Sequence, residues 1–527
     1  MTRMHRRLVA VLAAGATGLA TMAIAGPTAF ADGGKSQDAK KAKNIILLIG
    51  DGMGYTHVTA ARERYYGAAG KLNLQQADAA GQVSTYAVLP DSARPNLVTD
   101  SASAATAWSS GIKTYNGALG VDSAGKVVPT LMEQAKAAGM RTGNVSTAEI
   151  TDATPAGMFS HALRRGCQGP TYSASACNPE GKPTPDRVVV TPIAEQIARN
   201  GTADVIFGGG LSRFEPADEQ AMKAQGYQVL GSFGDPGVGT DNGAQTAATQ
   251  RVATRADLEA ANGAKVIGLF NRGNLTVEKS KAQAPADAAI RQEPSLPEYT
   301  AKAIELLAAG QGKRDGGNHD GGSKDGAGSG KGFLLQVEGA LIDKRSHAND
   351  AGQTLMEMKA FDDAVKVAKD FAAKDGNTLV ITTADHECAG FNIIGKGSFT
   401  NAEALAPPGN VDSGNPANTS TPRREYAANK KDPARSTGPI NGSGAGSPKN
   451  FAPATFRTAD DLAGVQDGST DASLWLSYAS GNHTGADVPI FAVGPQSARF
   501  LGPQDNTDIY RSMFSALKAL GDGQTSR

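Results

Sequence analysis

The sequence predicts an α/β fold, a three-layer α/β/α arrangement in which helices cover both faces of a central, mostly parallel sheet. Two observations support this prediction. Short apolar runs alternate with helical segments along most of the chain. The apolar runs are continuous rather than alternating, which is typical of strands covered on both faces. Open sheets of this kind bind ligands at the carboxyl ends of their strands, so the polar residues after each run are candidate site residues.

The N-terminus is typical of a secretory signal peptide. Three arginines in the first seven residues precede an apolar run, and Ala29-Phe30-Ala31 supplies a cleavage site of small residues. We expect residues 1–31 to be removed, residues 32–527 to form a single domain, and the product to be secreted. No later run is long and apolar enough to span a bilayer.

The overall charge gives no indication of a polyanionic partner. Lysine and arginine together number 52, as do aspartate and glutamate, so the formal net charge is zero. This balance favours neither a nucleic acid nor a charged membrane surface as partner.

The first predicted strand covers residues 44–50, a continuous apolar run that ends at Asp51 in a Gly-Asp-Gly turn. Further strands are expected over 142–146, 203–207, 265–270, 333–337, 378–382 and 488–493. Helices are expected over 131–138, 193–199, 299–308, 355–373 and 509–520. Gly139 and Gly376 follow two of these helices, where glycine commonly ends a helix. Strands that alternate with helices predict parallel pairing.

Two segments interrupt this alternation. Residues 310–332 are rich in Gly, Lys and Asp without an apolar period, which predicts a flexible surface loop. Residues 396–456 are rich in Pro, Asn, Ser and Gly, and we expect a long irregular insertion outside the sheet.

Ser101 follows a Thr-Asp turn and precedes small, helix-compatible residues, so we expect it in the first turn of a helix. The free N–H groups and positive dipole at such an end favour an anion. The hydroxyl could be a nucleophile if another group removed its proton, but no base lies beside it in the sequence. On this segment alone, an N-cap serine is the simpler interpretation.

Aspartates and histidines gather after the later predicted strands. Asp343 and His347 are one helical turn apart, Asp385 and His386 follow strand 378–382, and His483 lies in a loop. Mixed carboxylate and imidazole ligands suit a catalytic zinc ion with an open position. A single pair of this kind is common on protein surfaces, but their joint occurrence at strand ends indicates a metal site.

The chain resembles the secreted bacterial alkaline phosphatases. The resemblance rests on six stretches that occur in the same order as in that family: residues 49–54, 98–111, 143–155, 336–347, 382–386 and 483–485. With the helices between them, they cover most of the chain apart from the two irregular segments.

The resemblance implies metal-dependent hydrolysis of phosphate monoesters, with Ser101 as the nucleophile that becomes phosphorylated. It implies a first zinc ion (Zn2+) bound by Asp343, His347 and His483. It implies a second zinc ion bound by Asp51, Ser101, Asp385 and His386. It further implies one magnesium ion (Mg2+) bound by Asp51, Thr154 and Glu338. The all-oxygen set suits magnesium.

Three further side chains receive roles from the resemblance. Arg165 would bind the free oxygens of the phosphate, for which its planar fork is suited. Asp152 would lie just outside the magnesium ligands, and Lys344 would add positive charge near the phosphate. Small phosphate monoesters would be the substrates, outside the cytoplasm, where the enzyme would scavenge phosphate. The resemblance leaves open whether the protein forms a homodimer. Segment 396–456 falls where the family carries elements near the dimer contact, and here it is unusually long and polar.

The cysteines and the remaining histidines receive structural roles. Cys167 and Cys177 flank a short turn-rich loop, and export favours a disulfide between them. Cys388 is then expected to be a buried thiol; the alternative is that it approaches the metals, because it lies two residues after His386. We expect His57, His161 and His319 to be structural or at the surface.

Two other functions would fit parts of this pattern. A related enzyme with the same metal scaffold could hydrolyse phosphodiesters or sulfate esters, although Arg165 and the magnesium set favour a monoester dianion. A non-catalytic exported protein could bind metal or phosphate, but it would not need three metal sets around a nucleophile.

Overall fold

The computed structural model describes residues 40–170, 191–235, 248–309, 330–396 and 454–517, together with Cys177, Asn415, Asn418 and Leu520. The predicted signal peptide, most of loop 310–332 and most of insertion 396–456 lie outside the described residues. Within the described part of the chain, no helix combines the length and the hydropathy that a membrane span requires.

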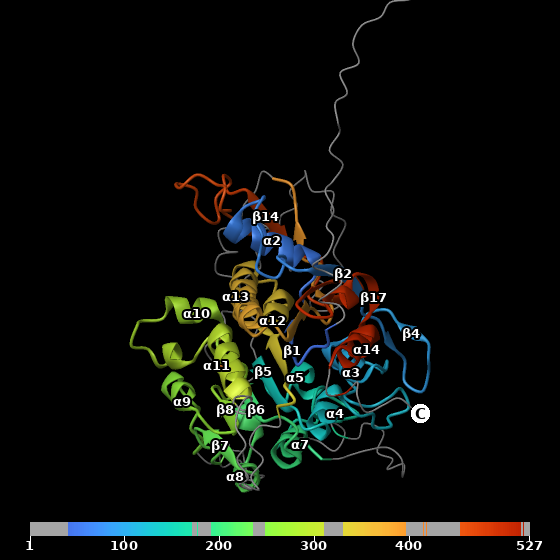
Figure 1. Cartoon of the computed structure of the whole chain (residues 1–527). Helices are drawn as coiled ribbons and strands as arrows, with labels where there is room; N and C mark the ends of the chain where they lie inside the picture. Colours follow the sequence, from blue (N-terminus) through green and yellow to red (C-terminus); the bar gives the residue numbers. More distant parts are fainter. Residues whose placement is uncertain are drawn as a thin grey trace, which may run out of the picture.

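A ten-stranded sheet forms the centre of the fold (Figure 1). In spatial order its strands are β17 (Gly502–Asp505), β2 (Ala79–Ser84), β16 (Val488–Val493), β10 (Thr378–Thr383), β1 (Asn44–Gly50), β9 (Phe333–Gly339), β5 (Arg141–Glu149), β6 (Val205–Gly209), β8 (Lys265–Leu269) and β7 (Tyr227–Leu230). All neighbouring strands from β10 to β7 pair in parallel, whereas β16 is antiparallel to both β10 and β2. The predicted α/β fold with a mostly parallel sheet is confirmed.

Helices cover the sheet on both sides. Figure 1 shows α11 (Leu296–Ala309) and α13 (Ala351–Asp375) on one side of the central strands, and α3 (Ser101–Ser110), α4 (Leu131–Ala137) and α14 (Asn506–Ala516) on the other. The remaining helices with assigned bounds are α2 (Tyr55–Tyr66), α5 (Ala153–Ala156), α7 (Ile193–Asn200), α8 (Pro216–Ala224), α9 (Arg255–Ala260), α10 (Glu278–Gln283) and α12 (Leu341–His347).

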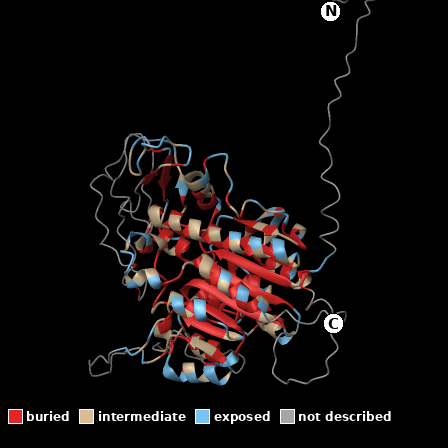
Figure 2. Ribbon diagram, turned by 60° about the vertical axis from the view of Figure 1, so that its left-hand side comes forward, coloured by how far each residue is buried: buried red, intermediate tan, exposed pale blue. Residues whose placement is uncertain are grey.

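The central strands are fully buried. Every residue of β1, β9 and β10 is buried, while the outer helices expose one face (Figure 2). This is the environment that the continuous apolar runs predicted. Small sheets lie outside the central one: β11 (Glu387–Cys388) pairs with β15 (His483–Thr484), β14 (Leu474–Ser477) pairs with β12 (Asn392–Ile393) and β13 (Ala454–Phe456), and β3 (Ala87–Val88) pairs with β4 (Pro95–Asn96).

Some element bounds differ from the predicted ones for reasons visible at the helix ends. Helix α13 begins earlier than predicted because the Asp350 carboxylate accepts a hydrogen bond from the Gln353 amide at 2.9 Å. Helix α14 also begins earlier, after the Asp505 cap, and ends earlier. The predicted elements did not include the helices α2, α5, α8, α9 and α10 or the strands β2, β7 and β17. Cys167 and Cys177 form the predicted disulfide, and Cys388 is free and buried.

Candidate active site

Four adjacent parallel strands bring acidic residues to one edge of the sheet. Asp51 directly follows β1 and Asp385 follows β10. Glu338 is the penultimate residue of β9, and Asp152 follows β5. The strands β1, β9 and β10 end at the same level, since Ile49 lies opposite both Glu338 and Thr383. The carboxylates therefore gather at the carboxyl edge of the sheet, where open α/β sheets bind ligands.

Ser101 is the first residue of α3 and faces this edge. The helix cap is Asp100, whose carboxylate accepts a hydrogen bond from the Ser103 amide at 3.0 Å. Asp100 therefore takes the capping role that the simpler interpretation gave to Ser101. The Ser101 side chain is buried, and its Oγ lies 3.3 Å from Nε2 of His386.

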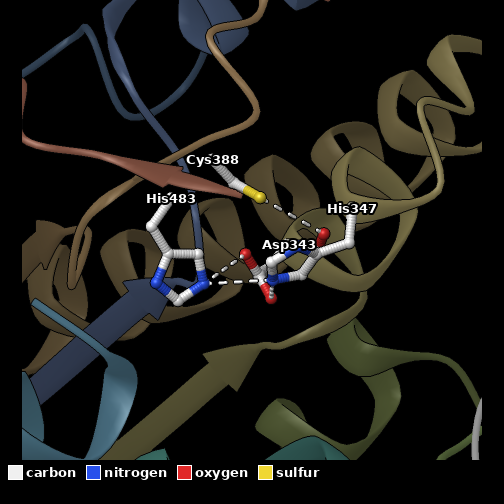
Figure 3. Close-up of side chains that lie close together, drawn as sticks. All are labelled: Asp343, His347, Cys388 and His483. Carbon is white, nitrogen blue, oxygen red and sulfur yellow. Dashed lines mark hydrogen bonds and ion pairs between the residues drawn. The ribbon is translucent and has the colours of Figure 1, made fainter. Parts of the chain in front are cut away.

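Asp343, His347 and His483 form the first candidate metal group (Figure 3). Helix α12 carries Asp343 and His347 on one face, and β15 carries His483. Nε2 of His347 lies 3.2 Å from Oδ2 of Asp343, and Nε2 of His483 lies 3.5 Å from Oδ1 of the same carboxylate. These three predicted ligands therefore converge on one point.

The two imidazoles of this group are oriented by backbone carbonyls. Nδ1 of His347 donates to the Gly481 carbonyl at 2.6 Å, and Nδ1 of His483 donates to the Thr99 carbonyl at 3.1 Å. A neutral imidazole held in this way presents a lone pair at Nε2, which is the orientation typical of a metal-bound histidine. The two Nε2 atoms face each other at 3.0 Å, so either a proton or a metal ion has to lie between them.

In the protein without metal, a proton can take that place. The Asp343 carboxylate raises the pKa of His347 to about 9, whereas burial lowers the pKa of His483 to about 4. One ring is therefore protonated and the other neutral at neutral pH. A divalent ion that binds here has to displace the proton from His347.

Asp51, Asp385 and His386 form a second group directly beside Ser101. Nε2 of His386 lies 2.9 Å from Oδ2 of Asp385 and 3.6 Å from Oδ1 of Asp51. Burial and the neighbouring charges of Asp385, Asp343 and Glu338 raise the pKa of Asp51 well above its ordinary value. The site therefore concentrates more negative charge than its own side chains neutralise.

Three buried carboxylate oxygens in these groups fit bound cations. Oδ1 of Asp51, Oδ1 of Asp343 and Oδ2 of Asp385 form no hydrogen bond with any described residue, and each lies 2.9–3.6 Å from Nε2 of His386 or His483. Buried carboxylate oxygens without a partner are costly unless a cation approaches them. Atoms from Asp51, Asp343 and His386 also lie close enough together to share one ion. The donor set of oxygen and imidazole nitrogen fits zinc.

The predicted magnesium ligands lie on the other side of Asp51. The Thr154 hydroxyl donates to Oδ2 of Asp51 at 3.5 Å, a long hydrogen bond, and Thr154 is on α5. Burial raises the pKa of Glu338 to about 7, and the Ser146 hydroxyl donates a hydrogen bond to its carboxylate. These side chains offer only oxygen atoms, which suits magnesium.

Arg165 and Lys344 are both attached to Asp152. The Arg165 guanidinium lies 2.7 Å from Oδ1 of Asp152 and 3.4 Å from Oδ2 of Asp100, and the Lys344 ammonium lies 2.8 Å from Oδ2 of Asp152. Although burial alone would raise it, these two cations hold the pKa of Asp152 well below its ordinary value. Arg165 keeps 33% of its side chain exposed, so its fork is accessible to a ligand.

The sequence analysis missed several residues that support the site. Gln336 is fully buried on β9; its Oε1 accepts from Nε1 of Trp108 at 3.1 Å, and its Nε2 donates to the Thr154 carbonyl at 3.0 Å. It thereby links α3, β9 and α5. The signal was its position two residues before Glu338, on the same face of the strand. Ser146 carried no signal, since it lies within an ordinary predicted strand.

The two described histidines that were expected to be structural are both buried. His57 contacts the Ser346 hydroxyl at 3.0 Å, and His161 contacts Glu133 at 2.9 Å. His319 lies outside the described residues.

Comparison with known proteins assigns the family. A family model described as alkaline phosphatase matches residues 42–519. The chain belongs to the alkaline phosphatase family. The alkaline phosphatase of Escherichia coli is 35% identical to it over 510 residues, which cover 91% of this chain and 86% of that protein. The streptomycin-6-phosphate phosphatase of Streptomyces griseus is 33% identical over 506 residues, with 90% of each chain covered.

Solved structures of this family share the fold. The alkaline phosphatase of Thermus thermophilus aligns with a TM-score of 0.60 at 22% identity, covering 93% of this chain and 96% of that one. A mutant of the TAB5 alkaline phosphatase with Mg bound aligns with a TM-score of 0.56 at 25% identity, covering 91% and 99%. This alkaline phosphatase is therefore a hydrolase of phosphate monoesters, and its carboxylate and imidazole groups are candidate sites for metal cofactors.

The bridging role of Gln336 can be tested by removing its amide. In a Gln336→Leu variant, Nε1 of Trp108 and the Thr154 carbonyl lose their buried partners, which should lower the free energy of unfolding by about 2–4 kcal/mol. Urea denaturation measures this loss. A matched Gln134→Leu variant, which removes a partly exposed amide, should cost less than about 1 kcal/mol. Equal effects of the two substitutions would contradict the bridging role.

Proposed function

We propose that this alkaline phosphatase hydrolyses phosphate monoesters to alcohol and inorganic phosphate through a phosphoserine on Ser101. One observation supports this most directly: the buried Ser101 hydroxyl lies 3.3 Å from His386, beside carboxylate oxygens that have no hydrogen-bond partner among the described residues. Ser101 has no neighbouring base in the sequence, and a cation bound beside these oxygens would activate its hydroxyl instead.

Three metal ions are part of the proposal. The first zinc ion would be held by Asp343, His347 and His483, and the second by Asp51, Asp385 and His386 with Ser101. The magnesium ion would be held by Asp51, Thr154 and Glu338. When bound, zinc lowers the pKa of a coordinated hydroxyl or water and neutralises a leaving oxygen.

The reaction then consists of two displacements at phosphorus, the first by Ser101 and the second by water. The Ser101 hydroxyl gives its proton to solvent and its Oγ forms a bond to phosphorus, while the bond from phosphorus to the ester oxygen breaks and the alcohol leaves with a proton from solvent. A water oxygen then loses a proton to solvent and forms a bond to phosphorus, the bond from Oγ breaks, Oγ takes up a proton, and phosphate leaves. The position of Ser101 at the N-terminus of α3 supports this role, because free backbone N–H groups at a helix N-terminus would stabilise the negative charge of the transferred phosphoryl group.

Arg165 would bind two free oxygens of the phosphate. Its ion pairs with Asp152 and Asp100 hold the guanidinium in place while a third of the side chain stays exposed. Such preorganisation favours the dianion of a monoester over a diester. A monoester has three non-bridging oxygens, so one can approach the metal ions while two accept the fork, whereas a diester has only two in all. Lys344, held by the other oxygen of Asp152, would add positive charge at the same place.

We further propose that the enzyme is secreted and scavenges phosphate outside the cytoplasm. The arginine-rich, apolar N-terminus and its small-residue cleavage motif support export. The disulfide between Cys167 and Cys177 is compatible with an oxidising compartment. A homodimer is compatible with this proposal, but most of segment 396–456, near the expected contact, lies outside the described residues.

Removal of the nucleophile should abolish turnover. A Ser101→Ala variant is expected to hydrolyse an aryl phosphate at least about 10³-fold more slowly than the wild type, also at saturating zinc. Ser109→Ala is the matched control, because Ser109 is buried on the same helix and its hydroxyl contacts only the backbone of that helix among the described residues. Unchanged turnover in Ser101→Ala would exclude this serine as the nucleophile.

Substrate choice separates a monoesterase from a diesterase built on the same scaffold. The wild type should prefer an aryl phosphate to the corresponding bis-aryl phosphate. Arg165→Ala should lower kcat/KM for the monoester roughly 10–100-fold, since hydrogen bonds to charged groups contribute about 1.5–3 kcal/mol, and should affect the diester less. A clear preference of the wild type for the diester would contradict the proposed activity.

A further inference from the structure

Cys388 lies beside the first metal group on a strand of its own. It is the second residue of β11, which pairs antiparallel with β15, and Cys388 lies directly opposite His483. Residues directly opposite each other in an antiparallel pair project their side chains to the same face of the sheet. The thiol and the His483 imidazole therefore share one face.

The Cys388 sulfur belongs to the same cluster of ligand atoms. Sγ of Cys388, a carboxylate oxygen of Asp343, and ring nitrogens of His347 and His483 all lie within 4.8 Å of one another. Figure 3 shows the sulfur directed toward this group, with Sγ 3.8 Å from the Asp343 backbone oxygen. The thiol is fully buried.

Two features of the surroundings indicate that this approach is built into the fold. Oδ1 of Asp343 is buried, points into the cluster and has no hydrogen-bond partner among the described residues. Gly52, at φ +72°, lies against the side chains of both Cys388 and Asp343. A Cβ at this position would meet Cβ of Cys388 at 2.8 Å and Cβ of Asp343 at 2.9 Å. Only glycine fits this backbone position, which lets the cysteine and the aspartate come together.

We propose that the Cys388 sulfur is a fourth protein ligand of the metal ion bound by Asp343, His347 and His483. As the ion binds, a bond forms between sulfur and metal, and the thiol proton leaves to solvent. Two nitrogens, one oxygen and one sulfur are donor atoms that zinc accepts in proteins. This inference rests on the first zinc site of the proposed function.

A sulfur ligand would give this site a metal preference that the other two lack. Thiolates favour soft or borderline ions such as zinc and cadmium, whereas magnesium and manganese prefer oxygen. Loss of the sulfur should weaken zinc binding at the first site by about 10–100-fold. Loss of a group that merely supports a ligand could have the same effect, so the test has to detect the metal–sulfur bond itself.

Cobalt(II) substitution provides that test on the full-length protein. Cobalt bound to a thiolate gives a near-ultraviolet charge-transfer band in addition to its visible ligand-field bands. Cys388 is the only free cysteine of the three in the chain, all of which are described, so such a band reports this residue alone. We expect the band in the wild type, and we expect Cys388→Ser to lose it while retaining visible cobalt bands.

The outcomes separate this inference from the proposed function. Visible bands without the charge-transfer band in the wild type would overturn the sulfur ligand and leave the first metal site intact. The wild type and a His347→Ala variant, each with one cobalt ion bound, should differ in their visible bands. Identical visible bands in the two proteins would contradict the first metal site itself. Should Cys388→Ser fail to fold, zinc X-ray absorption of the wild type decides: a scattering shell at about 2.3 Å supports sulfur, and only shells near about 2.0–2.1 Å exclude it.

Discussion

The burial of several carboxylates at one edge of the sheet is the constraint on which the rest of the site depends. Adjacent strands β10, β1 and β9 end at the same level, so the carboxylates of Asp385, Asp51 and Glu338 lie close together. Burial, together with the negative charges of these neighbours, raises the pKa of Asp51 well above its ordinary value. A fold that keeps such a group in its interior requires positive charge there, and divalent cations supply it most compactly.

The surrounding elements hold the functional groups against this charged edge. Asp100 caps α3 and so fixes the direction of Ser101, while the same carboxylate and Asp152 hold Arg165. Backbone carbonyls of Thr99 and Gly481 fix the two imidazoles of the first group. Nucleophile, phosphate-binding fork and proposed metal ligands are therefore oriented before a substrate arrives, which is the arrangement that phosphoryl transfer requires.

The sequence predicted the fold class and most residues of the candidate site. Buried parallel strands leave continuous apolar runs in the sequence, and the candidate ligand residues come shortly after these runs. Other features leave no such signal. The apolar run of β16 does not encode its antiparallel direction, and backbone acceptors such as the Thr99 carbonyl are invisible in a side-chain pattern. Cys388 was predicted to be a buried thiol, which it is. Its position two residues after His386 was a signal that it could approach the metals, but its place opposite His483 depends on the pairing of β11 with β15, and strands of two residues leave no clear pattern in a sequence.

The measurement that tests the central claim most directly compares the metal-free and the reconstituted protein. If the buried carboxylates require cations, zinc at about 1,000 times its Kd should raise the free energy of unfolding by about 4 kcal/mol. Zinc with magnesium should also restore the turnover of a phosphate monoester that chelation removes. Calorimetric unfolding and an aryl phosphate assay on the same samples would show both effects. A metal-free protein with the stability and turnover of the reconstituted one would contradict the account.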